Sequence, residues 1–456
     1  MDGTAALHPN LPMRQIFKTW WPLAASWLLM GAELPVLSAV VARLANPEIN
    51  LAAYGGVVFP LALIVESPII MLLAASTALS KDWDSYMKLR RFMLIAGASL
   101  TSLHILVAFT PIYYLVVGTI IGAPQEIIEP ARIGLMIMTP WTWSIAYRRF
   151  NQGLLIRFGH SQAVGIGTVV RLSADSLVLA IGYLVGSLPG IVVATSAVAA
   201  GVISEAVYVG FVKHPVLQHE LKYAKPVQPP LTLRSFLDFY IPLAMTSLLT
   251  LLANPIGSAA LSRMPDALGS LAVWPVVTGL IFMLRSLGVA YNEVVVALLD
   301  KPGSSQNLRR FTGLLSTTTT AALFLLAATP LSEFWFVQVS ALSPHLADLA
   351  QKSVWIALPL PALSVLQSWY QGAILHGRQT RGITESVIIY LVTSGVVLGA
   401  GVQWGQMTGL YIGMAALGLS VLSQTIWLWL RCQPVMHRVA VRDASLVAQP
   451  YEASTN

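Results

Sequence analysis

The sequence Pro22-Leu23-Ala24 returns as Pro242-Leu243-Ala244, and the repetition continues at a constant distance of 220 residues. The residues that recur at this offset are Pro35, Ser38, Arg43, Leu51 and Ala52, matched by Pro255, Ser258, Arg263, Leu271 and Ala272. Further along, one deleted loop residue makes the offset 219, which relates Leu89-Arg90-Arg91-Phe92, Pro140 and Gln152-Gly153 to Leu308-Arg309-Arg310-Phe311, Pro359 and Gln371-Gly372. Such duplication in an apolar chain is typical of transporters, whose substrate site lies between the repeats.

The composition predicts a membrane protein. Hydrophobic residues make up 56% of the 456 residues and charged residues only 10%, and the mean hydropathy is +0.70. A soluble domain carries about 25% charged residues, so the chain is predicted to be polytopic and all-α. A helix needs about 20 apolar residues to cross a bilayer. Twelve segments qualify: 16–43, 51–79, 92–118, 131–152, 162–186, 189–212, 235–262, 267–299, 311–331, 349–375, 384–402 and 406–431.

The chain divides at its most polar internal stretch. We predict an N-terminal six-helix lobe (1–213), a cytoplasmic linker (214–234), a C-terminal six-helix lobe (235–432) and a cytoplasmic tail (433–456). Since six spans separate the copies, both enter the membrane from the same side, and the repeats are related by an axis along the membrane normal. The predicted fold is therefore two parallel, pseudo-symmetric six-helix lobes. The residues expected to superpose are Pro22 on Pro242, Pro35 on Pro255 and Gln152 on Gln371.

The distribution of lysine and arginine predicts the orientation. If the N-terminus is cytoplasmic, that side holds 21 of these residues, including Arg148 and Arg149. The other side holds 4, namely Arg43, Arg132, Arg263 and Lys352. Because cytoplasmic loops are enriched in lysine and arginine, we expect both termini in the cytoplasm and the protein in the plasma (inner) membrane. The loops account for the net charge of +7 without a nucleic-acid partner.

Ionisable residues inside the spans are the functional candidates, because each costs at least a few kcal/mol at mid-membrane. Eight are present: Glu33, Glu66, Arg171, Asp175, Glu205, Arg285, Glu293 and Glu385. Arg171 and Asp175 are four residues apart on one helix and are expected to neutralise each other. Glu385, four residues after Arg381, is expected at the cytoplasmic interface. The first lobe is then left with three unpaired acids, and Arg285 is the one unpaired cation near mid-membrane.

These residues define candidate sites for ion coupling and for substrate. A buried carboxyl group that gains and loses a proton could couple transport to H⁺, or bind Na⁺, and the candidates are Glu33, Glu66, Glu205 and Glu293. The alternative for each acid is a hydrogen bond to a neighbouring helix. The substrate-binding candidates are Arg285, Asn254 and Asn292, and the helix-bend candidates are the repeat-matched prolines Pro35, Pro255, Pro140 and Pro359.

The sequence gives little support for a metal site, a disulfide, nucleotide binding or enzymatic activity. The eight histidines include no pair at metal-ligand spacing on one helix, and the single cysteine, Cys432, forms neither an internal disulfide nor a multi-thiolate metal site. No nucleotide-binding motif is present. We therefore expect no resident cofactor or metal and no enzymatic activity. The expected partners are the lipid bilayer and a small-molecule substrate.

Several short motifs resemble the multidrug/oligosaccharidyl-lipid/polysaccharide (MOP) exporter superfamily. They are Trp21-Pro22-Leu23 with Leu51-Ala52-Ala53-Tyr54-Gly55, then Pro242-Leu243-Ala244, and Asn292-Glu293 leading to Asp300-Lys301. The similarity covers nearly the whole chain and is greatest to the progressive ankylosis protein branch, with MATE-type exporters as relatives. It implies alternating access around a central cavity. The ankylosis branch implies efflux of small organic or phosphate-bearing anions; MATE relatives imply cation-coupled drug efflux, often with a coupling acid in the first helix, where Glu33 lies.

The main hypothesis is thus a secondary exporter, with several alternatives open. Within the superfamily, the alternatives are a cation-coupled multidrug exporter and a lipid-linked saccharide flippase, although the chain lacks the basic cluster expected of a flippase. A membrane-embedded lipid transferase would need a histidine or carboxylate constellation near a membrane face. A channel would not require two matched lobes with buried acids. The oligomeric state is left open.

The predicted orientation can be tested by labelling. Cysteines introduced at Gln228, in the linker, and at Asn46, in the first outer loop, should react with a membrane-impermeant maleimide from opposite sides, because only the linker is predicted to be cytoplasmic. Labelling in intact and permeabilised cells, on a Cys432→Ser background, measures this. Reaction of both sites from the same side would contradict the span assignment.

Overall fold

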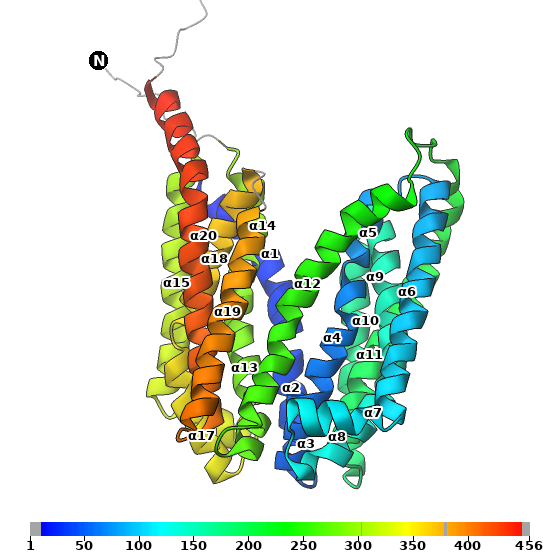
Figure 1. Cartoon of the computed structure of the whole chain (residues 1–456). Helices are drawn as coiled ribbons and strands as arrows, with labels where there is room; N and C mark the ends of the chain where they lie inside the picture. The colour runs from blue at the N-terminus through cyan, green and yellow to red at the C-terminus, as the bar shows by residue number, and fades with distance from the viewer. Residues whose placement is uncertain (1–10, 302, 378–380, 449–456) are drawn as a thin grey trace, which may run out of the picture.

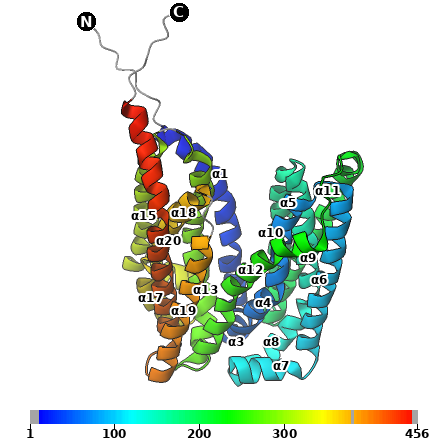
Figure 2. The same ribbon diagram turned by 45° about the horizontal axis from the view of Figure 1, so that its top comes forward.

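The computed structural model describes residues 11–301, 303–377 and 381–448, and these residues form helices and connecting turns without a strand. The helices gather into two groups that converge at one end of the molecule (Figure 1). Toward the other end, where the described chain begins at residue 11 and ends at residue 448, the groups diverge (Figures 1 and 2). The predicted all-α fold with two lobes is confirmed.

The first lobe is built from residues up to His219, in thirteen helical pieces. They are α1 (Met13–Gly31), α2 (Glu33–Val41), α3 (Pro47–Ala52), η1 (Ala53–Val58), α4 (Phe59–Ile70), α5 (Leu72–Leu79), α6 (Trp83–Phe109), α7 (Ile112–Tyr114), η2 (Leu115–Ile121), α8 (Gln125–Ile137), α9 (Thr139–Arg157), α10 (Ser161–Val185) and α11 (Gly190–His219), of which η1 continues directly into α4. A short 3₁₀ turn, η3 (Leu221–Tyr223), follows in the linker.

The second lobe repeats this order. Its helices are α12 (Leu233–Leu261), α13 (Ala267–Val289), α14 (Tyr291–Leu298), α15 (Ser304–Ala328), α16 (Leu331–Glu333), η4 (Phe334–Val339), α17 (Pro344–Ala357), α18 (Leu360–His376), α19 (Arg381–Trp404) and α20 (Gly409–Ala448).

The apolar helices agree with an integral membrane protein. Among the described residues, ten helices are long and apolar enough to cross a bilayer, and the bent pair α17 and α18 makes an eleventh. The pair α8 and α9 occupies the same place in the first repeat. Its apolar character is lowered by charged residues, among them Arg132, Arg148 and Arg149. The twelve predicted spans thus have twelve helical counterparts, one of which is unusually polar.

The backbone itself shows the duplication. A short π-helical segment follows the third span of each repeat, as η2 in the first and η4 in the second. Left-handed residues also recur: Asn46 (φ 51°) is matched 220 residues later by Asp266 (φ 54°), and Gly122 (φ 71°) is matched 219 residues later by Ala341 (φ 52°). Left-handed conformations are uncommon for residues other than glycine. Their recurrence shows that the two lobes share local geometry as well as sequence.

The repeat-matched prolines act differently in the two lobes. The first span breaks between α1 and α2, at Ala32, three residues before Pro35. Pro255, by contrast, lies inside the uninterrupted helix α12. The proline removes the same backbone hydrogen bond in each copy, but only the first copy has a glycine at the preceding turn, Gly31, which weakens the helix further. Pro140 and Pro359 directly follow helix breaks, and the second break bends its span by 40°.

Small residues allow the helices of each lobe to approach closely. A Cβ atom at Gly153 of α9 would lie 2.4 Å from the Leu73 carbonyl oxygen of α5. The repeat partner, Gly372 of α18, would place a Cβ 2.7 Å from Val295 of α14. Close backbone approach at small residues is a common source of packing energy between membrane helices. The repeated Gln-Gly pair therefore marks the same helix contact in both lobes.

The first helix of each lobe also contacts the opposite lobe. Trp20 of α1 donates a hydrogen bond to the Leu287 carbonyl of α13 (2.9 Å), and its ring packs edge-on against Phe311 of α15 at 5.6 Å. In the reverse direction, Tyr240 of α12 donates to the Pro68 carbonyl of α4 and packs against Phe92 of α6. Helices α1 and α12 therefore connect the lobes across the gap near the terminal end.

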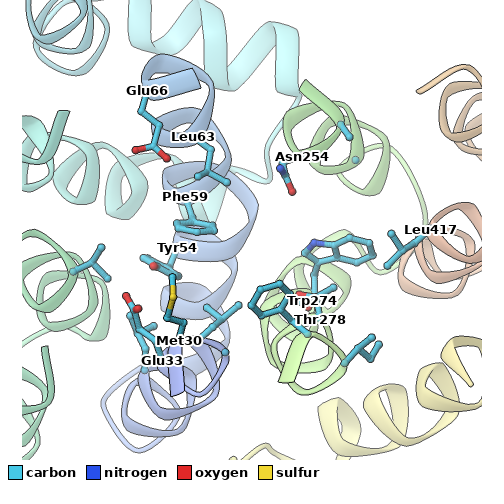
Figure 3. A pocket seen from close by; sticks show the side chains of 18 of the residues that line it. Met30, Glu33, Tyr54, Phe59, Leu63, Glu66, Asn254, Trp274, Thr278 and Leu417 are labelled. Atoms are coloured by element: carbon cyan, nitrogen blue, oxygen red, sulfur yellow. Dashed lines mark hydrogen bonds between the residues drawn. The ribbon is translucent and has the colours of Figure 1, made fainter. Parts of the chain in front are cut away.

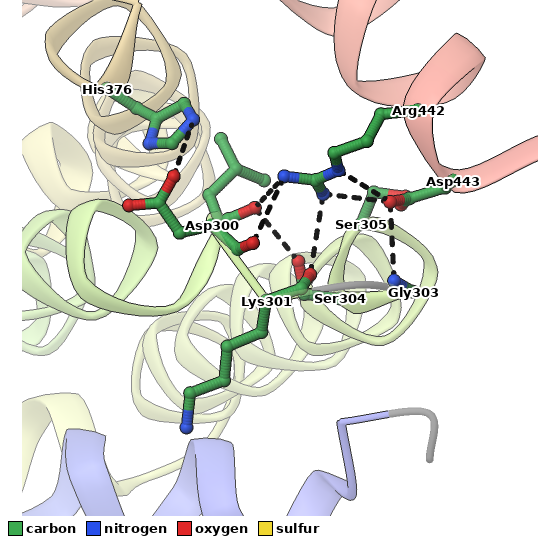
Figure 4. Close-up of polar contacts among 9 residues, drawn as sticks. Asp300, Lys301, Gly303, Ser304, Ser305, His376, Arg442 and Asp443 are labelled. Carbon is green, nitrogen blue, oxygen red and sulfur yellow. Dashed lines mark hydrogen bonds and ion pairs between the residues drawn. The ribbon is translucent and has the colours of Figure 1, made fainter. Parts of the chain in front are cut away.

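Helices α11 and α20 extend beyond the predicted lobe boundaries. Helix α11 continues past residue 213, and α20 continues past residue 433 into the segment predicted as a polar tail. Figure 4 shows what holds the end of α20. Arg442 donates hydrogen bonds to carbonyl groups of the loop between α14 and α15, and Asp443 accepts one from Ser305 at 2.5 Å. These contacts extend the helix because they fix its polar end on the lobe.

Candidate functional site

A cavity of about 540 Å³ lies between the two lobes. Its walls come from α1, α2, η1, α4, α9, α10 and α11 on one side, and from α12, α13, α19 and α20 on the other. In Figure 3, the labelled residues of the first lobe are Met30, Glu33, Tyr54, Phe59, Leu63 and Glu66, and those facing them from the second lobe are Asn254, Trp274, Thr278 and Leu417. Both aromatic and charged side chains therefore reach the same space.

The first lobe contains a buried network of charges beside this cavity. Arg171 of α10 donates to Glu33 of α2 at 2.7 Å, and its Nε lies 3.8 Å from Glu205 of α11. Glu205 is fully buried; it accepts hydrogen bonds from Arg148 and, at 2.7 Å, from Gln152, both on α9. One connected set of side chains thus joins four helices. A buried ion pair needs such additional hydrogen bonds to offset its desolvation.

Asp175 adds a third acid to this network. Its carboxylate is buried beside the charges of Glu33 and Arg171, and neither of its oxygens has a hydrogen-bond partner among the described residues. Gly201 provides the room, because a Cβ atom there would lie 1.8 Å from Asp175 Oδ1. The network formed by Glu33, Asp175, Glu205, Arg148 and Arg171 therefore has three acids and two arginines. With all five groups ionised, its formal charge is −1.

Two further charged groups face the cavity without being paired to each other. Glu66 of α4 is 4% exposed, and its Oε2 has no hydrogen-bond partner among the described residues. Arg149 of α9 also lines the cavity, and its Nε is likewise without a partner in that part of the chain. Unsatisfied buried polar atoms are rare in native proteins and often mark a functional site.

The second lobe contributes one cation to a largely apolar wall. Arg285 of α13 lines the cavity near the phenol of Tyr390 of α19. Its Nε has no hydrogen-bond partner among the described residues. Asn254 of α12 is exposed to the same cavity, and Trp274 supplies a large aromatic surface. The arrangement offers an anion a cationic contact on each lobe, Arg149 on one and Arg285 on the other.

The internal repeat shows that the charged network is confined to one lobe. At the 219-residue offset, Arg148 and Glu205 correspond to Gln367 and Gln424. These two glutamines form the same contact in neutral form, since Gln367 donates to Gln424 at 2.9 Å. Further equivalents of the charged residues are Ala253 for Glu33, Tyr390 for Arg171 and Ser394 for Asp175. The fold therefore does not require charges at these positions, and their presence in the first lobe needs another explanation.

The structure brings some of the predicted site residues together and leaves others apart. Glu33 and Glu66 line the cavity, and so do Arg285 and Asn254. Glu205 lies behind the wall in the network. The remaining two candidates do not line the cavity: Glu293 is exposed, and Asn292 donates to Gln371 at 3.4 Å.

The expected pairing of three charged residues, Arg171, Glu33 and Glu205, is wrong. Arg171 makes its ion pair with Glu33 rather than with Asp175 on its own helix, because α2 packs against α10 and presents the carboxylate there. Glu33 and Glu205 are consequently not unpaired acids.

Glu385 does lie among arginines, 3.2 Å from Arg381 and 2.5 Å from Arg431.

The sequence analysis missed Arg148 and Arg149 as site residues. They lie near the end of the predicted span 131–152 and were counted with the cytoplasmic segments, whereas α9 continues to Arg157 and places both inside the lobe. The cytoplasmic excess falls accordingly to 19 against 4, which leaves the predicted orientation unchanged. The spacing could have placed Arg148 beside Gln152, because Arg148 lies four residues before Gln152 and therefore on the same helix face.

Comparisons with known proteins establish the type of fold. No protein-family model matches the sequence, and a search among curated proteins finds no match. Among solved structures, a multidrug resistance MATE family transporter of the MOP superfamily in an inward-facing conformation is similar over 91% of this chain and 99% of that one, with a TM-score of 0.66 and 14% identity. The lipid II flippase MurJ in an inward closed conformation has a TM-score of 0.67 and 14% identity, over 95% of this chain and 94% of that one.

An outward-facing MATE transporter structure is less similar. Its TM-score is 0.59 at 14% identity, over 94% of this chain and 96% of that one. At these identities the similarity concerns the fold, and the chain has the fold shared by MATE transporters and MurJ. The predicted resemblance is confirmed as one of fold, to MATE transporters and MurJ.

The repeat suggests a direct test of the buried pair. Arg148→Gln should destabilise the protein by about 3–5 kcal/mol, because it leaves Glu205 as a buried carboxylate without its main partner. The double variant Arg148→Gln, Glu205→Gln should recover most of that loss, since it recreates the neutral pair of the second lobe. The midpoint of thermal unfolding in detergent micelles measures both. A double variant no more stable than the single one would contradict this account.

Proposed function

We propose that the chain is a secondary active exporter, rather than an enzyme, and that it moves a small anionic solute by alternating access between its two lobes. The observation that carries the proposal is the cavity between the lobes, with an incompletely bonded arginine on each wall. Its volume of about 540 Å³ is within the range of small-molecule sites. Lobes that approach or separate would change the distance between Arg149 and Arg285, and so the binding of an anion between them.

The end at which the two lobes diverge supports an inward-facing state. The lobes diverge toward the end where α1 begins and α20 ends (Figures 1 and 2), which the lysine and arginine distribution predicts to be cytoplasmic. The TM-scores also favour an inward-facing state, because the score is 0.66 against an inward-facing MATE transporter and 0.59 against an outward-facing one. In this state a cytoplasmic solute would enter, and export requires the opposite end to open.

The chemistry of the walls favours an organic anion with an apolar part. The cavity is lined by four arginines, Arg148, Arg149, Arg171 and Arg285, and by two acids, Glu33 and Glu66. Guanidinium groups bind carboxylate and phosphate in paired hydrogen bonds. Trp274, Phe59 and Phe282 offer surfaces on which a ring or chain can pack. We therefore favour an organic phosphate or carboxylate, as the ankylosis branch also implies, over a cationic drug.

Ion coupling is assigned to the first lobe. The network of Glu33, Asp175, Glu205, Arg148 and Arg171 lacks one positive charge, and the equivalent positions of the second lobe are neutral. A proton or Na⁺ bound between Glu33 and Asp175 would neutralise the network. Glu33 lines the cavity as well, so binding of the ion and of the solute can influence each other.

The coupling role predicts a separable defect. Glu33→Gln should leave the protein folded and able to bind substrate, because the amide has the shape of the protonated acid, but it should abolish the acceleration of transport by an imposed gradient. Flux of a radiolabelled organic phosphate from proteoliposomes, with and without a pH or sodium gradient, measures this. Glu293→Gln, which changes an acid outside the cavity, is the matched control. Normal gradient response in Glu33→Gln would move the role to Glu66 or Glu205.

The substrate charge predicts a second result. Arg285→Ala should weaken the binding of an anionic solute by about tenfold to hundredfold, the value of one or two charge-assisted hydrogen bonds. Arg149→Ala should act similarly from the other wall. The control is Arg438→Ala, because Arg438 is exposed and, within the described residues, donates to its own helix at Pro434. Unchanged anion affinity in both cavity variants, together with flux of a cationic dye, would favour a multidrug exporter instead.

A further inference from the structure

Arg43 connects the lobes at the end opposite the termini. It follows α2 of the first lobe and donates hydrogen bonds to the carbonyls of Gln338 at 2.6 Å and Val339 at 2.8 Å. These two carbonyls are the last of the π-helical segment η4, which belongs to the second lobe. A further bond to the Ala39 carbonyl (2.7 Å) fixes the guanidinium on its own helix.

Arg263 makes the reciprocal contact. It follows α12 of the second lobe, and it donates to the carbonyls of Thr119, Ile120 and Ile121 at 3.3, 2.7 and 2.6 Å. These carbonyls end η2, the π-helical segment of the first lobe. Arg263 is also held on its own helix, by the Ala259 carbonyl at 2.6 Å. Arg43 and Arg263 are equivalent residues of the two repeats, 220 positions apart, and each binds the equivalent segment of the other lobe.

The chemistry of these contacts suits a junction that can open. The last carbonyls of a helical segment lack intrahelical partners and carry a partial negative charge, so a cation binds them well. Both arginines are nevertheless exposed, unlike Arg148 in the buried network. Water can therefore replace the carbonyls when the lobes separate, and the net cost per hydrogen bond is modest.

The same end of the interface also depends on a close backbone approach. A Cβ atom at Gly55 of η1 would lie 2.5 Å from the ring of Pro275 in α13. These two residues are again related by the 220-residue offset, so they meet near the pseudo-symmetry axis. The arginines thus lie on either side of a tightly packed contact between the lobes.

We propose that Arg43 and Arg263 form a paired latch that holds this end of the cavity closed, and that both must release their carbonyl groups before the cavity opens to the opposite side of the membrane. The proposal rests on the alternating-access function proposed above. It adds the interaction that determines which side is closed.

A third arginine at the same end distinguishes a latch from an ordinary helix cap. Arg132 donates to the carbonyls of Ala108 and Phe109 at the end of α6, and to the hydroxyl of Tyr114. All these partners lie in its own lobe. Arg132 therefore makes the same kind of bond at the same end of the molecule without joining the lobes, and it provides a matched control.

The experiment measures the distance between the lobes at this end. Spin labels are attached to cysteines replacing Glu126 on α8 and Asp348 on α17, two exposed residues on opposite lobes, in the full chain with Cys432→Ser in lipid nanodiscs. In the double variant Arg43→Gln, Arg263→Gln, the ratio of long-distance to short-distance populations in pulsed electron resonance should rise by about tenfold or more. Arg132→Gln should leave the distribution unchanged.

The outcomes separate the latch from the function it rests on. If the wild-type protein shows a long-distance population under a pH or sodium gradient, and the double variant adds nothing to it, the latch is overturned and alternating access stands. If neither protein ever shows a second distance, both proposals fail. The single variants Arg43→Lys and Arg263→Lys, which keep the charge but lose the forked geometry, should give a smaller increase, and they replace the double variant if it does not fold.

Discussion

The need to neutralise charge inside the membrane governs the first lobe. An isolated charge at mid-membrane costs several kcal/mol, and here four charged side chains offset that cost by direct contacts, with Asp175 buried beside them. Arg171 reaches Glu33 and Glu205, and Glu205 is bonded by Arg148 and Gln152. Because these residues come from α2, α9, α10 and α11, the network also fixes how four helices lie against one another. A change in its protonation or ion binding would therefore affect the lobe as a whole.

Duplication of the fold allowed the two lobes to diverge in chemistry while keeping their geometry. The left-handed residues, the π-helical segments and the glycine contacts recur in both. At the positions of Arg148 and Glu205, the second lobe has two glutamines that bond to each other. Such pairs hold helices together at little electrostatic cost. The charged version beside the cavity is the reason for the ion-binding role proposed for the first lobe.

The two ends of the interface differ in a way that suits movement. At the terminal end, α1 and α12 cross between the lobes with aromatic contacts around Trp20 and Tyr240. At the opposite end, Arg43 and Arg263 bind carbonyl groups, and Gly55 lies against Pro275. The first set combines aromatic packing, which is not directional, with one hydrogen bond each from Trp20 and Tyr240, whereas the second is held by several hydrogen bonds from each arginine. Closure at one end and opening at the other can then be a two-state change.

The sequence by itself determined the membrane character, the twelve helical segments, the parallel repeat and the presence of acids such as Glu33 and Glu66 inside the spans. These follow from apolar length and from a constant offset, which are properties read along the chain. Only the tertiary structure decided which charges meet. Arg171 bonds to Glu33, 138 residues away, instead of its neighbour Asp175, and Arg43 binds a carbonyl 295 residues away. Spacing reports which residues share a helix face, but the partner of a buried charge is set by how the helices pack. Arg148 and Arg149 were left outside the predicted site because they lie near the end of the predicted span 131–152 and were counted with the cytoplasmic segments.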